Sequence, residues 1–339
     1  MAFDEAYESL TDHDDDSRWA YGTGFTDPFA GVSTAVPAGV DIDDLVAYCL
    51  MLGDDALIMS HRLQQWMTHA PELEDELAIA NLALDLLGQA RLLLSRAAEV
   101  EGAGRDEDAL AYLREPADFR NVHLAERADA DFAQLVARLL VFATWRLALL
   151  DRLSATRDPV LAAIGAKGVK ELTYHREYAA QWVVRLGDGT ALSHDRMQAA
   201  TDAVRPLVPE LFEPHPVEVR LAAAGVAVDP AALRAEFEAI WSQVLTAATL
   251  RPAPDGDASR AGTGGPGVAS RAGLSAPGGD PSRAGAGGPG VASRAGAGGP
   301  GGDVSRAGVG GRYGDHTAAL PEILAELQAL ARSMPGGVW

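Results

Sequence analysis

The sequence is poor in cysteine, which many extracellular proteins need for disulfide bonds. Cys49 is the only cysteine in 339 residues, so no disulfide can form within the chain. The first residues, MAFDEAYESLTDHDDDSRW, are acidic and contain no apolar signal core. Both features are typical of proteins from a reducing compartment, and we expect the chain to be cytoplasmic.

Aromatic residues and basic charge are also scarce. Aromatic residues make up only 6% of the chain, and 28 Lys and Arg face 48 Asp and Glu. The resulting formal net charge of −20 argues against a nucleic-acid partner, because phosphates need a basic surface. The apolar residues, 47% of the chain, are dominated by alanine and leucine, which favour helices over strands. These proportions predict an all-α fold.

Long uninterrupted apolar runs are missing as well. The most apolar stretch, LVARLLVFATWRLALL (135–150), is about one helix long and carries Arg138 and Arg146. A bilayer span needs ~20 predominantly apolar residues, so this stretch is too short and too charged to cross a membrane. We expect it to form a buried core helix instead, and we expect no membrane partner.

Helical periodicity begins near residue 41 and continues to about residue 250. Asp158-Pro159 is a typical cap and first residue of a helix, Gly102 suits a helix end, and Gly53 could interrupt the first helix. Pro206 and Pro209 should disturb a later helix. The predicted helices span residues 45–67, 71–102, 106–115, 132–153, 159–187, 193–212 and 231–250. Four of them are long, which predicts a ferritin-like four-helix bundle core with additional helices.

Composition divides the rest of the chain. Residues 1–40, with eight acids and one arginine, are predicted to be a disordered or loosely attached arm. Residues 41–250 form the helical domain. Residues 251–312 hold five copies of SRAG and most of the glycines, which predicts a disordered low-complexity insertion with seven arginines. Residues 313–339 contain an amphipathic helix and a short tail, and this helix should dock back on the helical domain.

One segment of the fourth long helix, KELTYH, raises the question of a metal site. Glu171 and His175 are four residues apart and therefore share one helix face. Helical bundles hold di-iron with one Glu from each of two helices and a Glu-x-x-His motif from each of two others. The sequence contains no Glu-x-x-His and no Asp-x-x-His. Glu171 and His175 are thus one residue too far apart for the usual motif.

The other long helices are equally poor in ligands. The second offers Asp85, but Gly88 stands where the histidine of the motif is needed. The third, from residue 132 to 150, contains no Asp, Glu or His at all. The first offers two aspartates and a histidine: Asp54, Asp55 and His61. The sequence therefore predicts no catalytic, cofactor-binding or metal site in this chain.

We interpret three residues as the polar remainder of a lost metal site. They are Asp85, Glu171 and His175. We expect Glu171 and His175 to bond to each other, with Lys167 or Lys170 neutralising the glutamate. Asp85 stands on an otherwise apolar helix and would need a partner if it is buried.

Several segments, in order along the chain, resemble one protein family. They are LGDDALIMSHRLQQWMTHAPELEDELAIANLALDLLGQARLLLSRAAEVEG, DEDALAYLREPADFRN, DPVLAAIGAKGVKELTYHREYAAQWVVRLGDGT, GVAVDPAALRAEFEA and HTAALPEILAELQALARSMPGGVW. These segments are similar to the PaaC-type subunit of phenylacetyl-CoA epoxidase. The resemblance covers about residues 41–250 and 313–339. The acidic arm and the SRAG insertion look like additions to the family pattern.

The resemblance implies a ferritin-like structural subunit that has lost its iron site. It implies a catalytic partner subunit that keeps the di-iron centre, further small subunits, and a reductase that supplies electrons from NADPH. In this family the complex uses O₂ to epoxidise the ring of phenylacetyl-CoA in aerobic phenylacetate breakdown. Two alternatives stay open from the residues alone: a catalytic di-metal oxygenase with an atypical ligand set, and a free-standing helical scaffold.

Overall fold

The computed structural model describes residues 31–251 and 310–334, and the account that follows is confined to them. The described residues contain ten α-helices and no strand, so the all-α prediction is confirmed. Three predicted segments lie wholly or mostly outside these residues: most of the acidic arm (1–30), nearly all of the SRAG insertion (252–309) and the last residues of the tail (335–339). The predictions made for those residues stay predictions. Residues 31–40, which were assigned to the arm, do contact the helices, because Arg96 donates to Thr34 O at 2.6 Å and Val36 and Val40 pack against the core.

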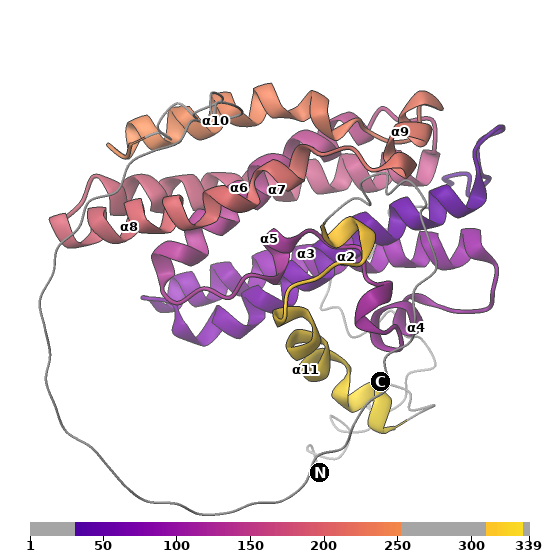
Figure 1. The fold of residues 1–339 in the computed structure, drawn as a ribbon, viewed down its shortest axis with the longest axis horizontal. Coiled ribbons are helices and arrows are strands. Elements are labelled where there is room, and N and C mark those ends of the chain that lie inside the picture. The colour runs from indigo at the N-terminus through magenta and orange to yellow at the C-terminus, as the bar shows by residue number, and fades with distance from the viewer. Residues whose placement is uncertain (1–30, 252–309, 335–339) are drawn as a thin grey trace, which may run out of the picture. The chain divides into compact units, whose positions relative to one another are not determined.

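Four long helices form the central part of the fold (Figure 1). Helix α2 (Ile42–Trp66) packs along α3 (Leu73–Glu101), and α6 (Phe132–Leu153) packs along α7 (Pro159–Gly187). The two pairs are joined because α3 contacts α7 and an α6 side chain bonds to the backbone of α2. The contacts therefore close a ring of four helices, as in a four-helix bundle.

The ends of these helices follow from local sequence. The Asp158 side chain accepts hydrogen bonds from Val160 N and Leu161 N, which caps α7, and proline takes its first position. Gly102 ends α3 in the left-handed conformation, with φ 64°. Asp131 caps α6 by accepting from Gln134 N. The boundaries of three of the four long helices were thus predictable from their caps.

The predicted break at Gly53 is wrong, because α2 continues through this residue without interruption. A Cβ on Gly53 would lie 3.0 Å from the Leu94 side chain of α3. The glycine therefore serves the close approach of two helices and does not interrupt one.

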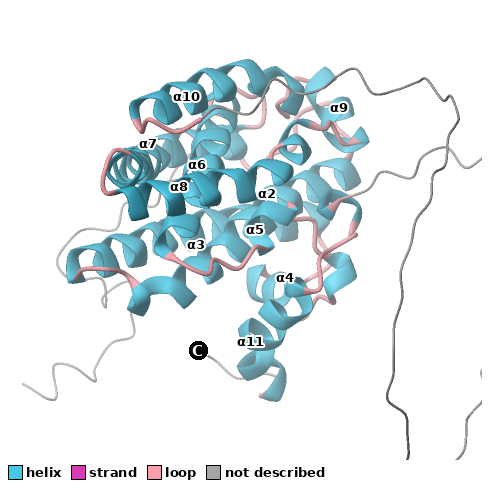
Figure 2. Cartoon of the chain, turned by 60° about the vertical axis from the view of Figure 1, so that its left-hand side comes forward, coloured by secondary structure: helices cyan, strands magenta, loops and turns pink. Residues whose placement is uncertain are grey.

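Shorter helices surround the four long ones. Helix α8 (Ala191–Val204) ends before two 3-10 turns that contain Pro206 and Pro209, so the predicted disturbance there is confirmed. The remaining elements are α4 (Glu107–Tyr112), α5 (His123–Glu126), α9 (Pro216–Ala223), α10 (Arg234–Ala247) and α11 (Ala319–Ser333). Helix α10 covers the α6/α7 pair, and α4 and α11 lie side by side next to α2 and α3 (Figures 1 and 2).

Two described helices, α3 and α6, are long and apolar enough to pass a compositional test for membrane spans. The most apolar window of α6 is 94% buried among the other helices, which confirms the predicted core helix. The corresponding window of α3 is equally hydropathic but only 44% buried. Helix α3 therefore exposes apolar surface that α6 does not.

The segment before α11 returns to the bundle and inserts a side chain into it. Arg312 was predicted to belong to the insertion, yet its side chain is only 7% exposed. Its guanidinium donates to Asp55 Oδ2 at 2.7 Å and to the carbonyl oxygens of Met51 and Arg120. Residues 310–312 therefore belong to the folded C-terminal part, because the bonds of Arg312 fix this segment against α2.

Candidate functional site

The three residues interpreted as remains of a metal site do come together, at the seam between α3 and α7. His175 is fully buried, and its Nε2 lies 3.0 Å from Asp85 Oδ2. Glu171 Oε2 accepts from Gln89 Nε2 at 2.9 Å, and its other oxygen contacts Lys167. The prediction that a lysine neutralises Glu171 is confirmed, with Lys167 as that lysine.

The predicted bond between Glu171 and His175 is wrong. Helices α3 and α7 run antiparallel, so Asp85 and Gln89 on α3 face His175 and Glu171 on α7 in reverse order. Asp85 and Gln89 are four residues apart on α3, and Glu171 and His175 are four residues apart on α7, so the two side chains on each helix share one face and are separated by one turn. Each polar side chain finds its partner across the seam, which also gives Asp85 the partner expected for it.

Helix α6 contributes a cation to the interior of the bundle. Arg146 is fully buried, and burial lowers the pKa of its guanidinium to about 10. Its Nε donates to Gln89 Oε1 at 2.9 Å, and Nη2 donates to Leu52 O at 3.1 Å. Gln89 thus links Arg146 to Glu171, because its amide accepts from one and donates to the other. A hydrogen-bonded chain from Glu171 through Gln89 and Arg146 to the Leu52 carbonyl therefore connects all four long helices.

These residues do not fit a di-iron centre. Such a centre needs acidic ligands from all four helices and two histidines. Helix α6 offers the buried guanidinium of Arg146, whose positive charge would repel a metal cation placed beside it. Within residues 31–251 and 310–334, no three His, Cys, Asp or Glu side chains are grouped closely enough to hold a metal.

The aspartates of α2 are engaged elsewhere. Asp54 is fully buried and forms a two-point ion pair with Arg114, and it also accepts from the backbone N–H of Arg120 at 2.9 Å. Asp55 is paired with Arg312 and accepts from Val122 N at 2.9 Å. Both carboxylates therefore hold the loop after α4 and the C-terminal segment against α2. His61, the third candidate on this helix, lies 3.4 Å from Glu326 of α11.

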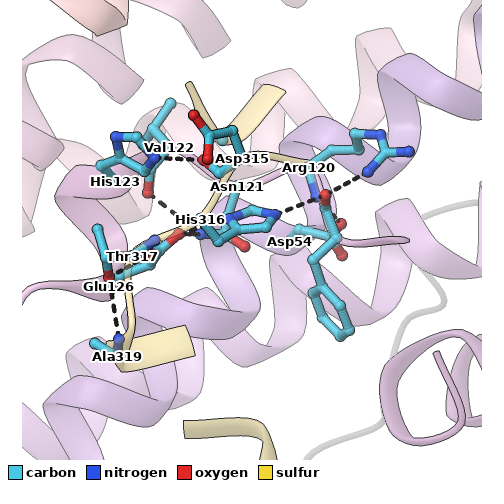
Figure 3. Close-up of polar contacts among 12 residues, drawn as sticks. Asp54, Arg120, Asn121, Val122, His123, Glu126, Asp315, His316, Thr317 and Ala319 are labelled. Carbon is cyan, nitrogen blue, oxygen red and sulfur yellow. Dashed lines mark hydrogen bonds and ion pairs between the residues drawn. The ribbon is translucent and has the colours of Figure 1, made fainter. Parts of the chain in front are cut away.

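A second buried acid, Glu126 of α5, binds the same C-terminal segment (Figure 3). Glu126 Oε1 lies 2.7 Å from His316 Nδ1, and Oε2 accepts from both the backbone N–H and the hydroxyl of Thr317. His316 Nε2 lies 2.9 Å from the Phe119 carbonyl oxygen. Both ring nitrogens face groups that only accept hydrogen bonds, which requires the doubly protonated imidazolium.

The hydrogen bonds around Glu126 and His316 shift the pKa values of both side chains. Burial alone would lower the pKa of His316, but hydrogen bonds to Glu126 and to the Phe119 carbonyl outweigh it and raise the pKa above its ordinary value. Burial alone would raise the pKa of Glu126, but hydrogen bonds from His316 and Thr317 lower it below its ordinary value. Both groups are thus held in their charged forms.

Comparison with known proteins gives this arrangement its context. Residues 33–266 match the family model described as phenylacetic acid catabolic protein, which unites PaaA and PaaC sequences. The chain is also 39% identical over 298 residues to a protein of Escherichia coli (strain K12) that is named as one of the subunits of 1,2-phenylacetyl-CoA epoxidase. That alignment covers 88% of this chain and the whole of the E. coli protein. The chain belongs to the PaaA/PaaC family.

Membership in the PaaA/PaaC family confirms the resemblance noted in the sequence and agrees with the ferritin-like helical fold. The matched region contains all four long helices and the α3–α7 seam. The E. coli protein matches along its entire length although this chain is longer.

Sequence reasoning missed the residues that neutralise the candidates. Arg146 was noted only as a charge unsuited to a membrane, and Arg114 and Gln89 were not considered. An arginine in the most apolar helix was a usable signal, because a fully buried cation needs acceptors nearby. Arg312 was hidden by its proximity to the SRAG repeats. His316 was considered only for the metal motif, and its pairing with Glu126 joins residues 190 positions apart.

Proposed function

We propose that this chain is a non-catalytic, structural subunit of a phenylacetyl-CoA epoxidase that acts in aerobic phenylacetate degradation. Its similarity to the E. coli epoxidase subunit, over the whole length of that protein, supports membership in such a complex. The observation that carries the structural role is Arg146, a buried guanidinium in the interior of the four-helix ring. The acids Asp54, Asp55 and Glu171 are paired with cations of the chain itself, so no metal is needed to balance their charge.

The proposal includes a partner that performs the chemistry. A related helical subunit with Glu-x-x-His motifs would hold the di-iron centre, and further small subunits and a reductase would complete the complex. In this arrangement the chain holds the catalytic subunit in its active form and contributes no ligand. We place the complex in the cytoplasm, in line with the single buried cysteine.

Reconstitution tests the proposal. The chain and the Glu-x-x-His subunit of the same complex are purified separately, and epoxidation of phenylacetyl-CoA is measured with the reductase and NADPH present. We expect the two subunits to elute together in size-exclusion chromatography and the activity to depend on both. Full activity of the partner without this chain would contradict the structural role, and the absence of any complex would support the free-standing scaffold.

The same assay separates the structural role from an atypical oxygenase. Asp85 is half-buried, so Asp85→Asn should preserve the fold and remove one candidate ligand. We expect the complex with Asp85→Asn to retain its turnover and iron content within about twofold, because this carboxylate serves His175 and no metal. A loss of iron from the variant complex would favour the atypical oxygenase.

A further inference from the structure

The outer face of α3 carries a row of exposed leucines. Leu73, Leu77 and Leu84 are 66%, 58% and 61% exposed, and Leu87 is 37% exposed. Their spacing of four, seven and three residues places them on one side of the helix, opposite its buried face. From Leu73 to Leu87 the row is about 21 Å long at 1.5 Å per residue. We call these four residues the leucine row.

The leucine row is unusual for a surface that faces water. The most apolar window of α3 is as hydropathic as that of α6, yet less than half of it is buried. Exposed leucines scattered singly need no explanation, but a contiguous row on one helix marks an interaction surface.

Gly88, which lies beside the leucine row, also indicates an interaction surface. Gly88 lies inside α3, where glycine destabilises a helix relative to alanine. A Cβ added to Gly88 would meet no atom within 4 Å, in contrast to Gly53, where the Leu94 side chain is already close. Packing within the described residues thus gives no reason for a glycine at this position. A helix from another protein could approach the backbone closely at this point.

Hollows flank the leucine row at both ends. One, of about 290 Å³, lies where the start of α3 meets Tyr178 and Trp182 of α7. The other, of about 320 Å³, lies between the second half of α3 and α4 and is lined in part by Leu87. Tyr174, one helical turn from Tyr178 on α7, is also 51% exposed.

The charges around the two hollows are mainly acidic. The first hollow contains Glu72, Glu74 and Asp75 but only one basic residue, Arg185. The second contains Glu107 and Asp108, with Arg91 already paired to Glu107. Burial and the neighbouring acids Glu107 and Asp106 raise the pKa of Asp108, so a cation at this end would be favoured.

We propose that the leucine row is the docking surface for another subunit of the epoxidase complex, which presents an apolar helix with basic residues at both ends. This rests on the proposed function. Three other occupants meet like charge. A second copy of the chain brings the same acidic ends, the N-terminal residues 1–30 carry eight acids and one arginine, and an anionic lipid surface repels acids.

Binding measurements with the purified Glu-x-x-His subunit test this docking surface. Leu84→Glu places a charge in the centre of the leucine row and should weaken binding by on the order of tenfold or more. The matched control is Leu192→Glu on α8, because Leu192 is 64% exposed and lies outside the row. This control should bind as the wild type does. Circular dichroism of each variant must show an unchanged helical content and melting temperature.

Gly88→Ala is a second test, in which the stability of the isolated chain and its binding to the partner should change in opposite directions. Alanine should raise the melting temperature of the isolated chain by about 2–4 °C, because it favours the helix and meets open space. It should nevertheless weaken the complex, since the added methyl group stands where the partner helix approaches. A variant that is more stable alone and binds more weakly cannot be explained by misfolding.

The outcomes separate this proposal from the proposed function. Equal affinity of wild type, Leu84→Glu and Gly88→Ala would overturn the docking surface while leaving the subunit role intact. A wild-type chain that binds no other subunit would overturn both. A homodimer in sedimentation that Leu84→Glu dissociates, tighter subunit binding after removal of residues 1–30, or binding to anionic vesicles that Leu84→Glu abolishes would each assign the row to another occupant.

Discussion

Single residues determine how well this bundle could hold a metal, and the clearest case is the pairing of three candidate acids with arginine or lysine. Asp54 is bound by Arg114, Asp55 by Arg312 and Glu171 by Lys167. These partners lie between four and more than 250 positions away in the chain. The sequence identified the acids because their helix positions can be counted. It could not identify distant partners, because pairing over such separations depends on the packed fold.

Loss of Arg312 should strongly destabilise the protein. Arg312→Ala leaves the fully buried Asp55 without its cation, which costs about 3–5 kcal/mol in the free energy of unfolding. Urea unfolding followed by circular dichroism measures the change. Arg105→Ala is the control, because Arg105 is exposed and its pair with Glu101, four residues away on the surface, is worth about 0–1 kcal/mol. Equal effects of the two substitutions would show that Arg312 does not carry a buried pair.

The Glu126–His316 pair should make stability depend on pH. The pKa of His316 is raised on folding above the unfolded value of 6.5, so its contribution is complete below about pH 6.5 and declines as pH rises through the folded pKa. Besides Glu126, the charge of Asp54 also favours the protonated ring. We expect the difference in unfolding free energy between wild type and His316→Gln to be larger at pH 6 than at pH 9.

The Glu126 side of the pair gives the companion experiment. In a Glu126→Gln background, His316→Gln should lose most of this pH dependence, because the carboxylate that binds the imidazolium is gone. A difference between wild type and His316→Gln that stays constant from pH 6 to pH 9 would contradict the protonated state assigned to His316.

At the scale of helices, the glycines Gly53 and Gly165 lie where two helices approach closely. The sequence predicted the starts and ends of helices well where a cap is recognisable, as with the Asp158 side chain at the start of α7 and the left-handed Gly102 at the end of α3. It failed at Gly53, because a glycine inside a helix can either interrupt it or permit a neighbour. Only the neighbour's position separates the two cases.

The hairpin of α6 and α7 should be sensitive to a single methyl group. A Cβ on Gly165 would lie 2.7 Å from Ser154 N and 2.8 Å from Leu150 O, both backbone atoms that cannot rotate away. Gly165→Ala should therefore lower the free energy of unfolding by about 1–3 kcal/mol despite the better helix propensity of alanine. Thermal unfolding of this variant beside Gly88→Ala should show opposite shifts. A stabilised Gly165→Ala would contradict the close packing of α6 and α7.

At the scale of the whole molecule, the C-terminal segment returns to the bundle. Its amphipathic pattern predicted that α11 docks, and α11 does contact α2, α4 and α5. The boundary of the insertion was misplaced because Arg312 resembles the arginines of the repeats. The family match and the E. coli alignment support membership in an epoxidase complex, as the resemblance of the sequence segments had implied.

The SRAG repeats themselves should be dispensable. Deletion of residues 265–300 retains Gly310, Arg312 and more than 20 connecting residues, so the C-terminal segment can still reach its site. We expect the shortened chain to form the epoxidase complex and support turnover as the full chain does. Loss of either, in a variant whose melting temperature is unchanged, would assign a role to the insertion.

The most direct test of the structural role is the iron content of this chain alone. The chain is purified without its partner, exposed to Fe²⁺ under anaerobic conditions, desalted and analysed by plasma emission spectrometry, with His175→Ala in parallel. We predict far less than one iron per chain for both proteins, because Arg114, Lys167 and Arg312 already neutralise the acids of α2 and α7 and Arg146 places a further cation in the interior. Stoichiometric iron in the wild type that disappears in His175→Ala would contradict the account.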